Sequence, residues 1–291
     1  MKRFKLSSIF TPTLPSPVKG EGFIGGAKLV FIMGPCVIED EKTFLFTAES
    51  LAEISSKFKI PLVFKASYDK ANRTSIKSYR GPGIKAGLKL LKKAKKTFGF
   101  PVLTDVHCRN DVKEVAEVVD IIQIPAYLCR QTDLLIEAGK TGRAVNIKKG
   151  QFMAPLDMRH AVDKVLSTGN DNIILTERGV SFGYNNLVVD FRALPVMRSL
   201  GYPVVFDATH SVQAPAGKGA SSGGDRTMAR YLARAAVAVG VDGVFMEVHP
   251  DPEKALSDGP NSIYIKDLGV IIKELLDIDR AIQLSVKTDT R

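Results

Sequence analysis

The sequence predicts a (β/α)8 barrel, a closed ring of eight parallel strands in which a helix follows each strand. Short apolar runs alternate with segments of helical spacing eight times between residues 29 and 284. Polar residues also recur at the C-terminal end of nearly every apolar run. In a closed barrel these ends converge on one face, where active sites form from the loops. An open doubly wound sheet is the alternative, and it would spread the same residues along a line.

The eight predicted strands are nearly continuous apolar runs, as expected when both faces of a parallel sheet are buried. They cover residues 29–33, 62–65, 102–105, 121–125, 144–148, 172–176, 204–207 and 243–247. Apolar residues spaced three and four apart predict the helices between and after them. The predicted helices cover residues 42–58, 84–98, 110–119, 131–141, 158–167, 191–200, 227–239 and 266–284.

Two segments fall outside this alternation. Residues 1–27 contain several prolines and glycines and have no sustained period, which predicts a flexible N-terminal extension. Residues 28–291 are then a single barrel domain that carries catalysis. The glycine-rich stretches at 215–219 and 221–224 lack the Gly-Lys-Ser/Thr ending of a phosphate-binding loop. They predict a mobile loop after the seventh strand that could act as a lid.

The bulk composition narrows the possible partners. The chain of 291 residues has 41 basic and 31 acidic residues, a net charge of +10. This charge suits nucleic acid or anionic small molecules, but no nucleic-acid-binding signature accompanies it. Cys36, Cys108 and Cys129 are too few and too scattered for a disulfide framework and suit a reducing compartment. No run approaches the roughly 18 apolar residues of a membrane span. We therefore expect a cytoplasmic protein with neither a nucleic-acid nor a membrane partner.

The segment 64–83 leaves the second predicted strand and predicts an anion site. It contains five cations, Lys65, Lys70, Arg73, Lys77 and Arg80, among short Ser, Thr and Asn side chains. Arginine offers a bidentate fork to phosphate or carboxylate, and lysine offers a point charge. A solvated basic loop is the alternative. The direct exit from a buried strand favours the anion site.

Further cations lie at other strand ends and form one set with this loop: Lys65, Lys70, Arg73, Arg130, Lys148 and Arg178. One phosphate needs roughly two or three such donors. Six donors therefore indicate more than one anionic group, and so phosphorylated substrates. The alternative is that these cations form structural ion pairs with Asp69, Asp105, Asp133 or Glu177.

A second set has the side chains of a metal site: Cys36 after the first strand, His210 after the seventh, Glu247 at the end of the eighth and Asp258 beyond it. Mixed Cys, His and carboxylate ligands suit a divalent transition metal such as Fe²⁺, Zn²⁺, Mn²⁺ or Co²⁺. The alternative is that Cys36 is a small buried hydrophobe and His210 has no special role. The metal site depends on the barrel, which would bring strands one, seven and eight side by side.

Several motifs resemble those of the 3-deoxy-D-manno-octulosonate 8-phosphate synthases, also called 2-dehydro-3-deoxyphosphooctonate aldolases. They lie at residues 64–73, 78–83, 123–126, 128–133, 146–149, 177–179, 182–184, 207–210 and 247–251, and the resemblance runs from residue 29 to 284. The resemblance implies a (β/α)8 barrel and a homotetramer. It implies the condensation of phosphoenolpyruvate with D-arabinose 5-phosphate and water, which releases inorganic phosphate and feeds lipopolysaccharide biosynthesis.

The resemblance also implies roles for individual residues. Those expected around phosphoenolpyruvate are Lys65, Lys70, Gln123, Lys148 and Arg178. Asn72 and Arg73 would hold arabinose 5-phosphate, and Thr74 keeps a hydroxyl beside them. Arg130 would reach the sugar phosphate of a neighbouring subunit. The expected catalytic residues are Asp105, Lys148, His210 and Asp258.

The family has metal-dependent members with Cys, and metal-independent members with Asn, after the first Gly-Pro. This chain has Gly34-Pro-Cys36, and His210, Glu247 and Asp258 match the other ligand positions. The resemblance therefore implies the metal-dependent class, although residues 258–260 (Asp-Gly-Pro) resemble the segment of metal-independent members.

Two other functions stay open. A related 7-phosphate synthase uses erythrose 4-phosphate and has Lys-Pro-Arg-Thr-Ser where residues 70–75 of this chain read Lys-Ala-Asn-Arg-Thr-Ser. Asn72 therefore favours the longer sugar. The other alternative is a non-catalytic phosphosugar-binding barrel, against which the intact Lys148, Arg178, His210 and Glu247 argue.

Overall fold

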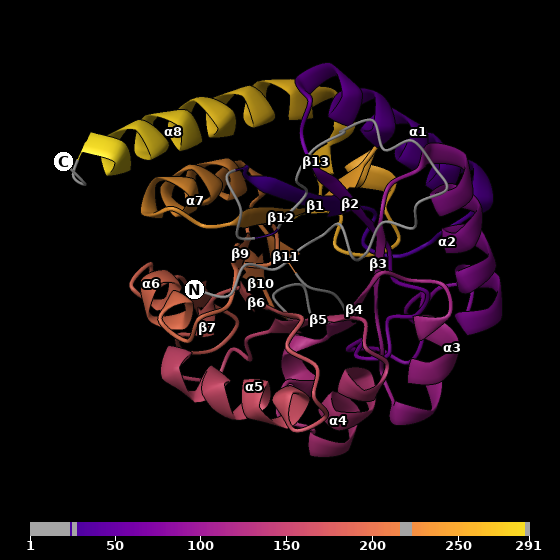
Figure 1. Ribbon diagram of the computed structural model, residues 1–291. Coiled ribbons are helices and arrows are strands. Elements are labelled where there is room, and N and C mark those ends of the chain that lie inside the picture. The colour runs from indigo at the N-terminus through magenta and orange to yellow at the C-terminus, as the bar shows by residue number, and fades with distance from the viewer. Residues whose placement is uncertain (1–23, 25–27, 216–222, 289–291) are drawn as a thin grey trace.

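The computed structural model describes residue 24, residues 28–215 and residues 223–288. Within these residues, parallel strands close into a barrel that helices surround (Figure 1). The barrel strands are β1 (Val30–Gly34), β2 (Leu62–Lys65), β3 (Val102–Asp105), β4 (Ile121–Ile124), β5 (Ala144–Lys148), β6 (Ile173–Glu177), β9 (Val204–Asp207) and β12 (Gly243–His249). Pairing of β1 with β12, from Val30 and Gly243 to Gly34 and Glu247, closes the ring. The predicted (β/α)8 barrel is confirmed, and the open sheet is excluded.

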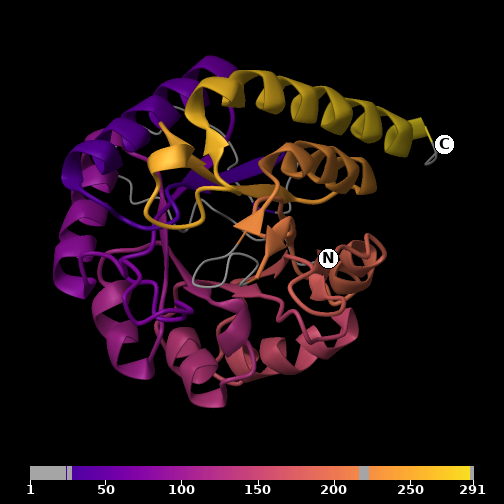
Figure 2. The ribbon, with the colours of Figure 1, turned by 180° about the vertical axis from the view of Figure 1, so that it is seen from behind.

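The helices follow the strands as predicted. They are α1 (Glu41–Phe58), α2 (Ile84–Phe98), α3 (Val112–Ala116), α4 (Thr132–Lys140), α5 (Met158–Leu166), α6 (Ala193–Arg198), α7 (Arg226–Val239) and α8 (Leu268–Thr288). The largest difference in length is at α3, which covers half of the predicted residues 110–119 and follows a short 3-10 turn (Arg109–Asp111). Helix α8 projects beyond the ring toward the C-terminus (Figure 2). No helix among the described residues is both long and apolar enough to cross a membrane.

Apolar side chains are buried on both faces of the barrel wall, which explains the continuous apolar runs. On β1, Val30 and Ile32 belong to one buried cluster, and Phe31 and Met33 belong to the other. The first cluster fills the inside of the barrel, and the second packs the strands against the helices. Ile24 is fully buried in the first cluster. The rest of the predicted N-terminal extension lies outside the described residues.

Short strands were not predicted. They are the hairpin of β7 (Val180–Ser181) and β8 (Leu187–Val188), the pair β10 (Gln213–Ala214) and β11 (Gly223–Gly224), and β13 (Ile263–Tyr264), which pairs with the end of β12. Two residues are too few for a periodic pattern to identify a strand. Strands β10 and β11 bracket the predicted lid, whose residues 216–222 lie outside the described part of the chain.

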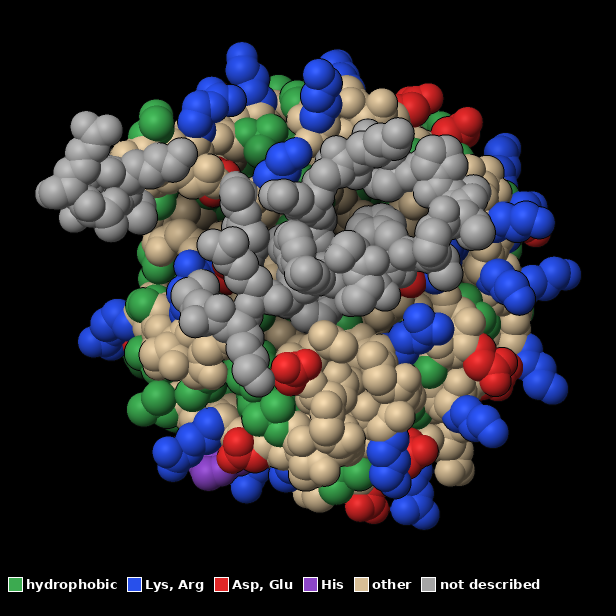
Figure 3. Space-filling model, viewed as in Figure 1, with side chains coloured by type: hydrophobic (Ala, Val, Ile, Leu, Met, Phe, Trp, Pro, Cys, Tyr) green, Lys and Arg blue, Asp and Glu red, His purple; other side chains and the backbone are tan. Residues whose placement is uncertain are grey.

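Basic side chains are scattered over the face of the molecule that Figure 3 shows. On the face in Figure 3, Lys and Arg side chains are distributed around the rim and are interspersed with Asp and Glu. Helix α2 contributes several of the lysines and has Lys95 and Lys96 in its last turn, where cations suit the helix dipole. A few cations are instead buried at the strand ends, among them Lys65 and Lys148.

Candidate active site

A cavity of about 420 Å³ opens at the C-terminal ends of the barrel strands. Most of the predicted site residues line it: Lys65, Lys70, Asn72, Arg73, Thr74, Asp105, Gln123, Lys148, Arg178, His210, Glu247 and Asp258. Cys36 lies against it, with Sγ 3.2 Å from Oδ2 of Asp258. Arg130 is exposed and is not among the lining residues of this cavity in the described part of the chain.

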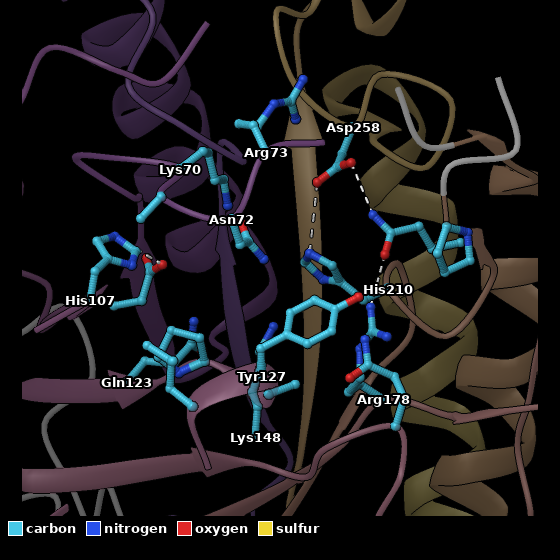
Figure 4. A pocket seen from close by; sticks show the side chains of 18 of the residues that line it. Lys70, Asn72, Arg73, His107, Gln123, Tyr127, Lys148, Arg178, His210 and Asp258 are labelled. Carbon is cyan, nitrogen blue, oxygen red and sulfur yellow. Dashed lines mark hydrogen bonds and ion pairs between the residues drawn. The ribbon is translucent and has the colours of Figure 1, made fainter. Parts of the chain in front are cut away.

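Lys148 and Arg178 form a buried cationic group on one side of the cavity (Figure 4). Nζ of Lys148 pairs with Oδ2 of Asp207, and Nη2 of Arg178 donates to Oε1 of Gln213 at 2.9 Å. Burial lowers the pKa of both cations. Nη1 of Arg178 is buried and has no hydrogen-bond partner among the described residues. An unpaired buried donor is costly, so this nitrogen suits an anionic ligand.

Lys65 lies deeper, where β1 and β2 approach closely. A Cβ atom on Gly34 would lie 1.9 Å from the backbone oxygen of Lys65, so the approach requires glycine. Nζ of Lys65 donates to the backbone oxygen of Cys36 at 2.9 Å and lies 2.6 Å from Oε1 of Glu247. Nζ of Lys70 lies 3.8 Å from the same Glu247 oxygen. Both lysines therefore border the predicted metal site.

The loop after β2 forms the opposite side of the cavity, where Asn72 and Arg73 lie across from Lys148 and Arg178 (Figure 4). Nη1 of Arg73 donates to Oγ of Ser257 at 2.8 Å, which ties the loop to the segment after β12. The backbone N–H of Lys70 donates to the oxygen of Arg80 at 2.6 Å. These contacts hold a second cationic group in place.

The site cations do not form the structural ion pairs that were the alternative to an anion site. The four candidate partners of the site cations contact other residues: Asp69 pairs with Arg80, Asp105 with His107, Asp133 with Arg109 and Glu177 with Lys149. Two site cations, Lys65 and Lys148, pair instead with Glu247 and Asp207 inside the site. Their charges are partly compensated within the cavity itself.

Asp105 remains ionised beside these cations. Its carboxylate accepts a hydrogen bond from Oγ of Ser67, and its Oδ2 lies 3.7 Å from Nε2 of His107. Burial opposes ionisation, but His107 and Lys70 hold the pKa of Asp105 at about 2. At neutral pH this carboxylate accepts hydrogen bonds and does not donate a proton.

The predicted metal ligands come together. Ligand atoms of Cys36, Glu247 and Asp258 all lie within 4.8 Å of one another. Nε2 of His210 lies 3.6 Å from Oε1 of Glu247 and 3.9 Å from Oδ2 of Asp258. Oε2 of Glu247 is buried and has no hydrogen-bond partner among the described residues. A carboxylate with one orphaned buried oxygen, grouped with a thiol and an imidazole, fits a divalent transition metal.

Neighbouring residues contact two of these ligands. Nδ1 of His210 lies 2.8 Å from Oδ2 of Asp207, and Nε2 of Gln213 donates to Oδ1 of Asp258 at 3.0 Å. Asp258 has a φ of 50°, in the left-handed region that residues other than glycine rarely adopt. Burial, with Asp258 and Glu247 nearby, raises the pKa of the Cys36 thiol well above its usual value.

Three contact residues of the site were not predicted as site residues: Asp207, Gln213 and Ser257. The sequence does carry a signal for Asp207, because it ends a strand as Asp105 does. Gln213 and Ser257 lie in loops, and only their contacts with Arg178, Asp258 and Arg73 connect them to the site.

A (β/α)8 barrel with anion-binding cations and a Cys, His and carboxylate cluster at its strand ends has the architecture of a barrel enzyme. The chain belongs to the DAHP synthetase I family, whose model matches residues 15–283.

Individual relatives indicate a more specific resemblance than the family model does. The 2-dehydro-3-deoxyphosphooctonate aldolase of Geotalea uraniireducens is 62% identical over 261 residues, which are 89% of this chain and 96% of the relative. The protein of the same name from Geobacter sulfurreducens is also 62% identical over 261 residues, with the same coverage. That of Pelobacter propionicus is 59% identical over 266 residues, 89% of this chain and 98% of the relative. The resemblance predicted from the motifs is confirmed.

Proposed function

We propose that this protein condenses phosphoenolpyruvate with D-arabinose 5-phosphate and water to form 3-deoxy-D-manno-octulosonate 8-phosphate and inorganic phosphate. The observation that carries the proposal is two cationic groups facing each other across one cavity. Lys148 and Arg178 lie on one side, and Arg73 lies with Asn72 on the other. Two anionic substrates fit this arrangement. The shared name of relatives about 60% identical to this chain supports the same reaction.

Each of the two cationic groups binds one of the two substrates. Phosphoenolpyruvate binds at Lys65, Lys70, Gln123, Lys148 and Arg178, and all of these donors except Lys70 are buried. The sugar phosphate binds at Asn72, Arg73 and Thr74 on the opposite loop. The cations offset the repulsion between the two anions and hold them in proximity, which turns an encounter in solution into a reaction within one site.

The reaction forms one C–C bond and one C–O bond and breaks one C–O bond. C3 of phosphoenolpyruvate attacks the aldehyde carbon, water adds at C2, and the tetrahedral species expels phosphate by cleavage of its C–O bond. The added water gives one proton to the aldehyde oxygen, and the hydroxyl that it leaves on C2 gives its proton to the departing phosphate as the C2 carbonyl forms. His210 and Asp258, which line the cavity, are the residues we propose for this proton traffic. Ionised Asp105 accepts a hydrogen bond beside the reacting atoms.

We also propose a divalent transition metal, Fe²⁺, Zn²⁺, Mn²⁺ or Co²⁺, held by Cys36, His210, Glu247 and Asp258. When bound, such an ion supplies a Lewis acid that orients and polarises an oxygen ligand. The support is the donor set and the orphaned Oε2 of Glu247.

We propose a homotetramer in which Arg130, exposed on this chain, contacts the sugar phosphate of a neighbouring subunit. The cysteines Cys36, Cys108 and Cys129 are free, which supports a cytoplasmic location. The product would feed lipopolysaccharide biosynthesis.

An assay with both candidate sugars tests the function. The purified protein is given phosphoenolpyruvate with arabinose 5-phosphate or with erythrose 4-phosphate, and released phosphate and the keto-sugar product are measured. We expect turnover with arabinose 5-phosphate and little with the shorter sugar. A preference for erythrose 4-phosphate would identify the related 7-phosphate synthase. Absence of phosphate release with either sugar would support a non-catalytic barrel.

A further inference from the structure

A chain of buried hydrogen bonds crosses three neighbouring strands of the barrel wall. Oγ1 of Thr176 on β6 donates to Oδ1 of Asn146 on β5 at 2.6 Å. Nδ2 of Asn146 in turn donates to Oε1 of Gln123 on β4 at 3.2 Å. Thr176 and Asn146 are fully buried, whereas Gln123 lines the cavity. The chain therefore leads from the barrel wall to the phosphoenolpyruvate side of the site.

The direction of each hydrogen bond determines the orientation of the next side-chain amide in the chain. A side-chain amide has a donor end and an acceptor end, and its orientation follows from its partners. The Thr176 hydroxyl can join Oδ1 of Asn146 only by donating, which turns the NH2 group of Asn146 toward Gln123. Gln123 must then turn its oxygen to Asn146. Its Nε2 is left without an acceptor among the described residues and is available to a ligand.

We infer that Thr176 and Asn146 are positioning residues that hold the Gln123 amide as a hydrogen-bond donor to phosphoenolpyruvate. The inference rests on the proposed function. A glutamine presents an attractive N–H or a repulsive carbonyl oxygen to an anion, depending on its orientation. Carboxylate and phosphate both accept hydrogen bonds, so the donor orientation suits either end of this substrate. The strand positions suit this role, because side chains on strands are held more rigidly than those on loops.

The strand register places the Gln123 amide on the same face of the sheet as Lys148. Gln123 pairs with Asn146 in the ladder between β4 and β5, and Lys148 follows two residues later on β5. Residues two apart on a strand point to the same face. The Gln123 amide and the Lys148 ammonium therefore face the same cavity, as Figure 4 shows.

Variants at Thr176 test the inference. Thr176→Val keeps the shape of the side chain and removes the hydroxyl, whereas Thr176→Ser keeps the hydroxyl. We expect Thr176→Val to weaken phosphoenolpyruvate binding, measured by titration calorimetry, and to raise its KM about tenfold, the effect of one lost hydrogen bond to a charged group. The KM for arabinose 5-phosphate should stay unchanged. Thr176→Ser should restore tight binding of phosphoenolpyruvate.

Asn146→Asp gives an independent test. An aspartate at 146 can only accept, so Gln123 would turn Nε2 toward it and present its oxygen to the anion. We expect phosphoenolpyruvate to bind more weakly in this variant than in Thr176→Val. In a Gln123→Ala background, Thr176→Val should cause no further loss of phosphoenolpyruvate affinity, because the amide that it positions is gone.

Thr104→Val is the matched control, since Thr104 is a fully buried threonine on β3 whose hydroxyl donates to the backbone oxygen of Ala66. We expect it to lower stability without a selective change in phosphoenolpyruvate KM. Equal changes in both KM values in Thr176→Val, or additive losses in the Gln123→Ala background, would overturn the inference. A wild-type protein that forms no product from the two substrates would instead overturn the proposed function.

Discussion

Nδ1 of His210 lies 2.8 Å from Oδ2 of Asp207, three residues earlier in the chain. This contact is electrostatic, because Nδ1 of His210 is buried and has no hydrogen-bond partner among the described residues. Nε2 faces Glu247 and Asp258, at 3.6 and 3.9 Å. The same oxygen of Asp207 pairs with Nζ of Lys148. One buried carboxylate therefore lies against both a proposed metal ligand and a proposed substrate cation.

We expect Asp207→Asn to lower the free energy of unfolding at pH 7 by about 3–5 kcal/mol, because buried Lys148 loses its counter-charge. Burial opposes ionisation of Asp207, but His210 and Lys148 hold its pKa well below the usual range. A depressed folded-state pKa gives stability that is present above the unfolded-state pKa of about 3.9 and is lost as the pH falls below it. Urea denaturation should therefore give the same loss at pH 7 and pH 5.

Asp190→Asn is the control for Asp207→Asn. Asp190 pairs with Arg192 at the surface, and loss of this ion pair should leave the urea midpoint of unfolding unchanged. A loss in Asp207→Asn that shrinks between pH 7 and pH 5 would show that Asp207 titrates in this range, against our expectation.

Removal of the proposed metal should abolish activity. We expect chelation with EDTA to stop product formation, and Fe²⁺, Mn²⁺ or Co²⁺ to restore it. Cys36→Ala should weaken metal binding at least about tenfold, because it removes the thiolate that completes the donor set. Elemental analysis of the purified variant measures the metal directly.

Cys108→Ala provides the comparison, because Cys108 is an exposed free cysteine. It should bind metal as the unmodified protein does. Cys36→Asn, which introduces the residue of metal-independent relatives, should reduce the dependence on metal. Full activity in EDTA together with a metal-free protein by elemental analysis would contradict the metal proposal.

Arg73→Lys should raise the KM for arabinose 5-phosphate about tenfold, because lysine cannot offer phosphate the bidentate fork of arginine. The KM for phosphoenolpyruvate should change little, since Lys148 and Arg178, two of its proposed donors, lie across the cavity. Steady-state kinetics with each substrate varied in turn measures the difference. Arg80→Lys is the control on the same loop, where Arg80 pairs with Asp69 near the surface. Equal effects of both variants on the sugar KM would argue against Arg73 as the sugar-phosphate ligand.

Lys149→Met should lower the free energy of unfolding by about 3–5 kcal/mol, because it leaves a buried carboxylate without its partner. Nζ of Lys149 is fully buried 3.5 Å from Oε2 of Glu177. Oε1 of Glu177 accepts hydrogen bonds from the backbone N–H groups of Arg178 and Gly179, so weaker phosphoenolpyruvate binding should accompany the loss. Urea denaturation and calorimetry measure the two effects.

Lys140→Met is the matched surface variant, because Lys140 pairs with Glu137 in the open. It should affect neither stability nor substrate binding. Unchanged stability in Lys149→Met would mean that the buried pair contributes nothing net to the fold.

The local sequence pattern predicted most of the fold and many of the candidate site residues. Each predicted barrel strand is present, and Lys65, Asp105 and Lys148 end their strands as expected. Periodicity could not identify β7, β8, β10, β11 or β13, because each has only two residues. Gln213 also escaped prediction, because its two contacts in the site join it to residues 35 and 45 positions away.

Strand order and the polar residues at strand ends follow from the sequence, because burial of a parallel sheet imposes local apolar runs. The partners of those polar residues do not follow from it. Closure of β1 against β12 brings Cys36 to Asp258, 222 residues apart, and the fold pairs Lys65 with Glu247 and Lys148 with Asp207. The sequence therefore establishes which chemical groups are available, and three-dimensional packing establishes which charges compensate one another and which donors remain free for substrate. Such contacts depend on distances between remote segments, and no local pattern encodes those distances.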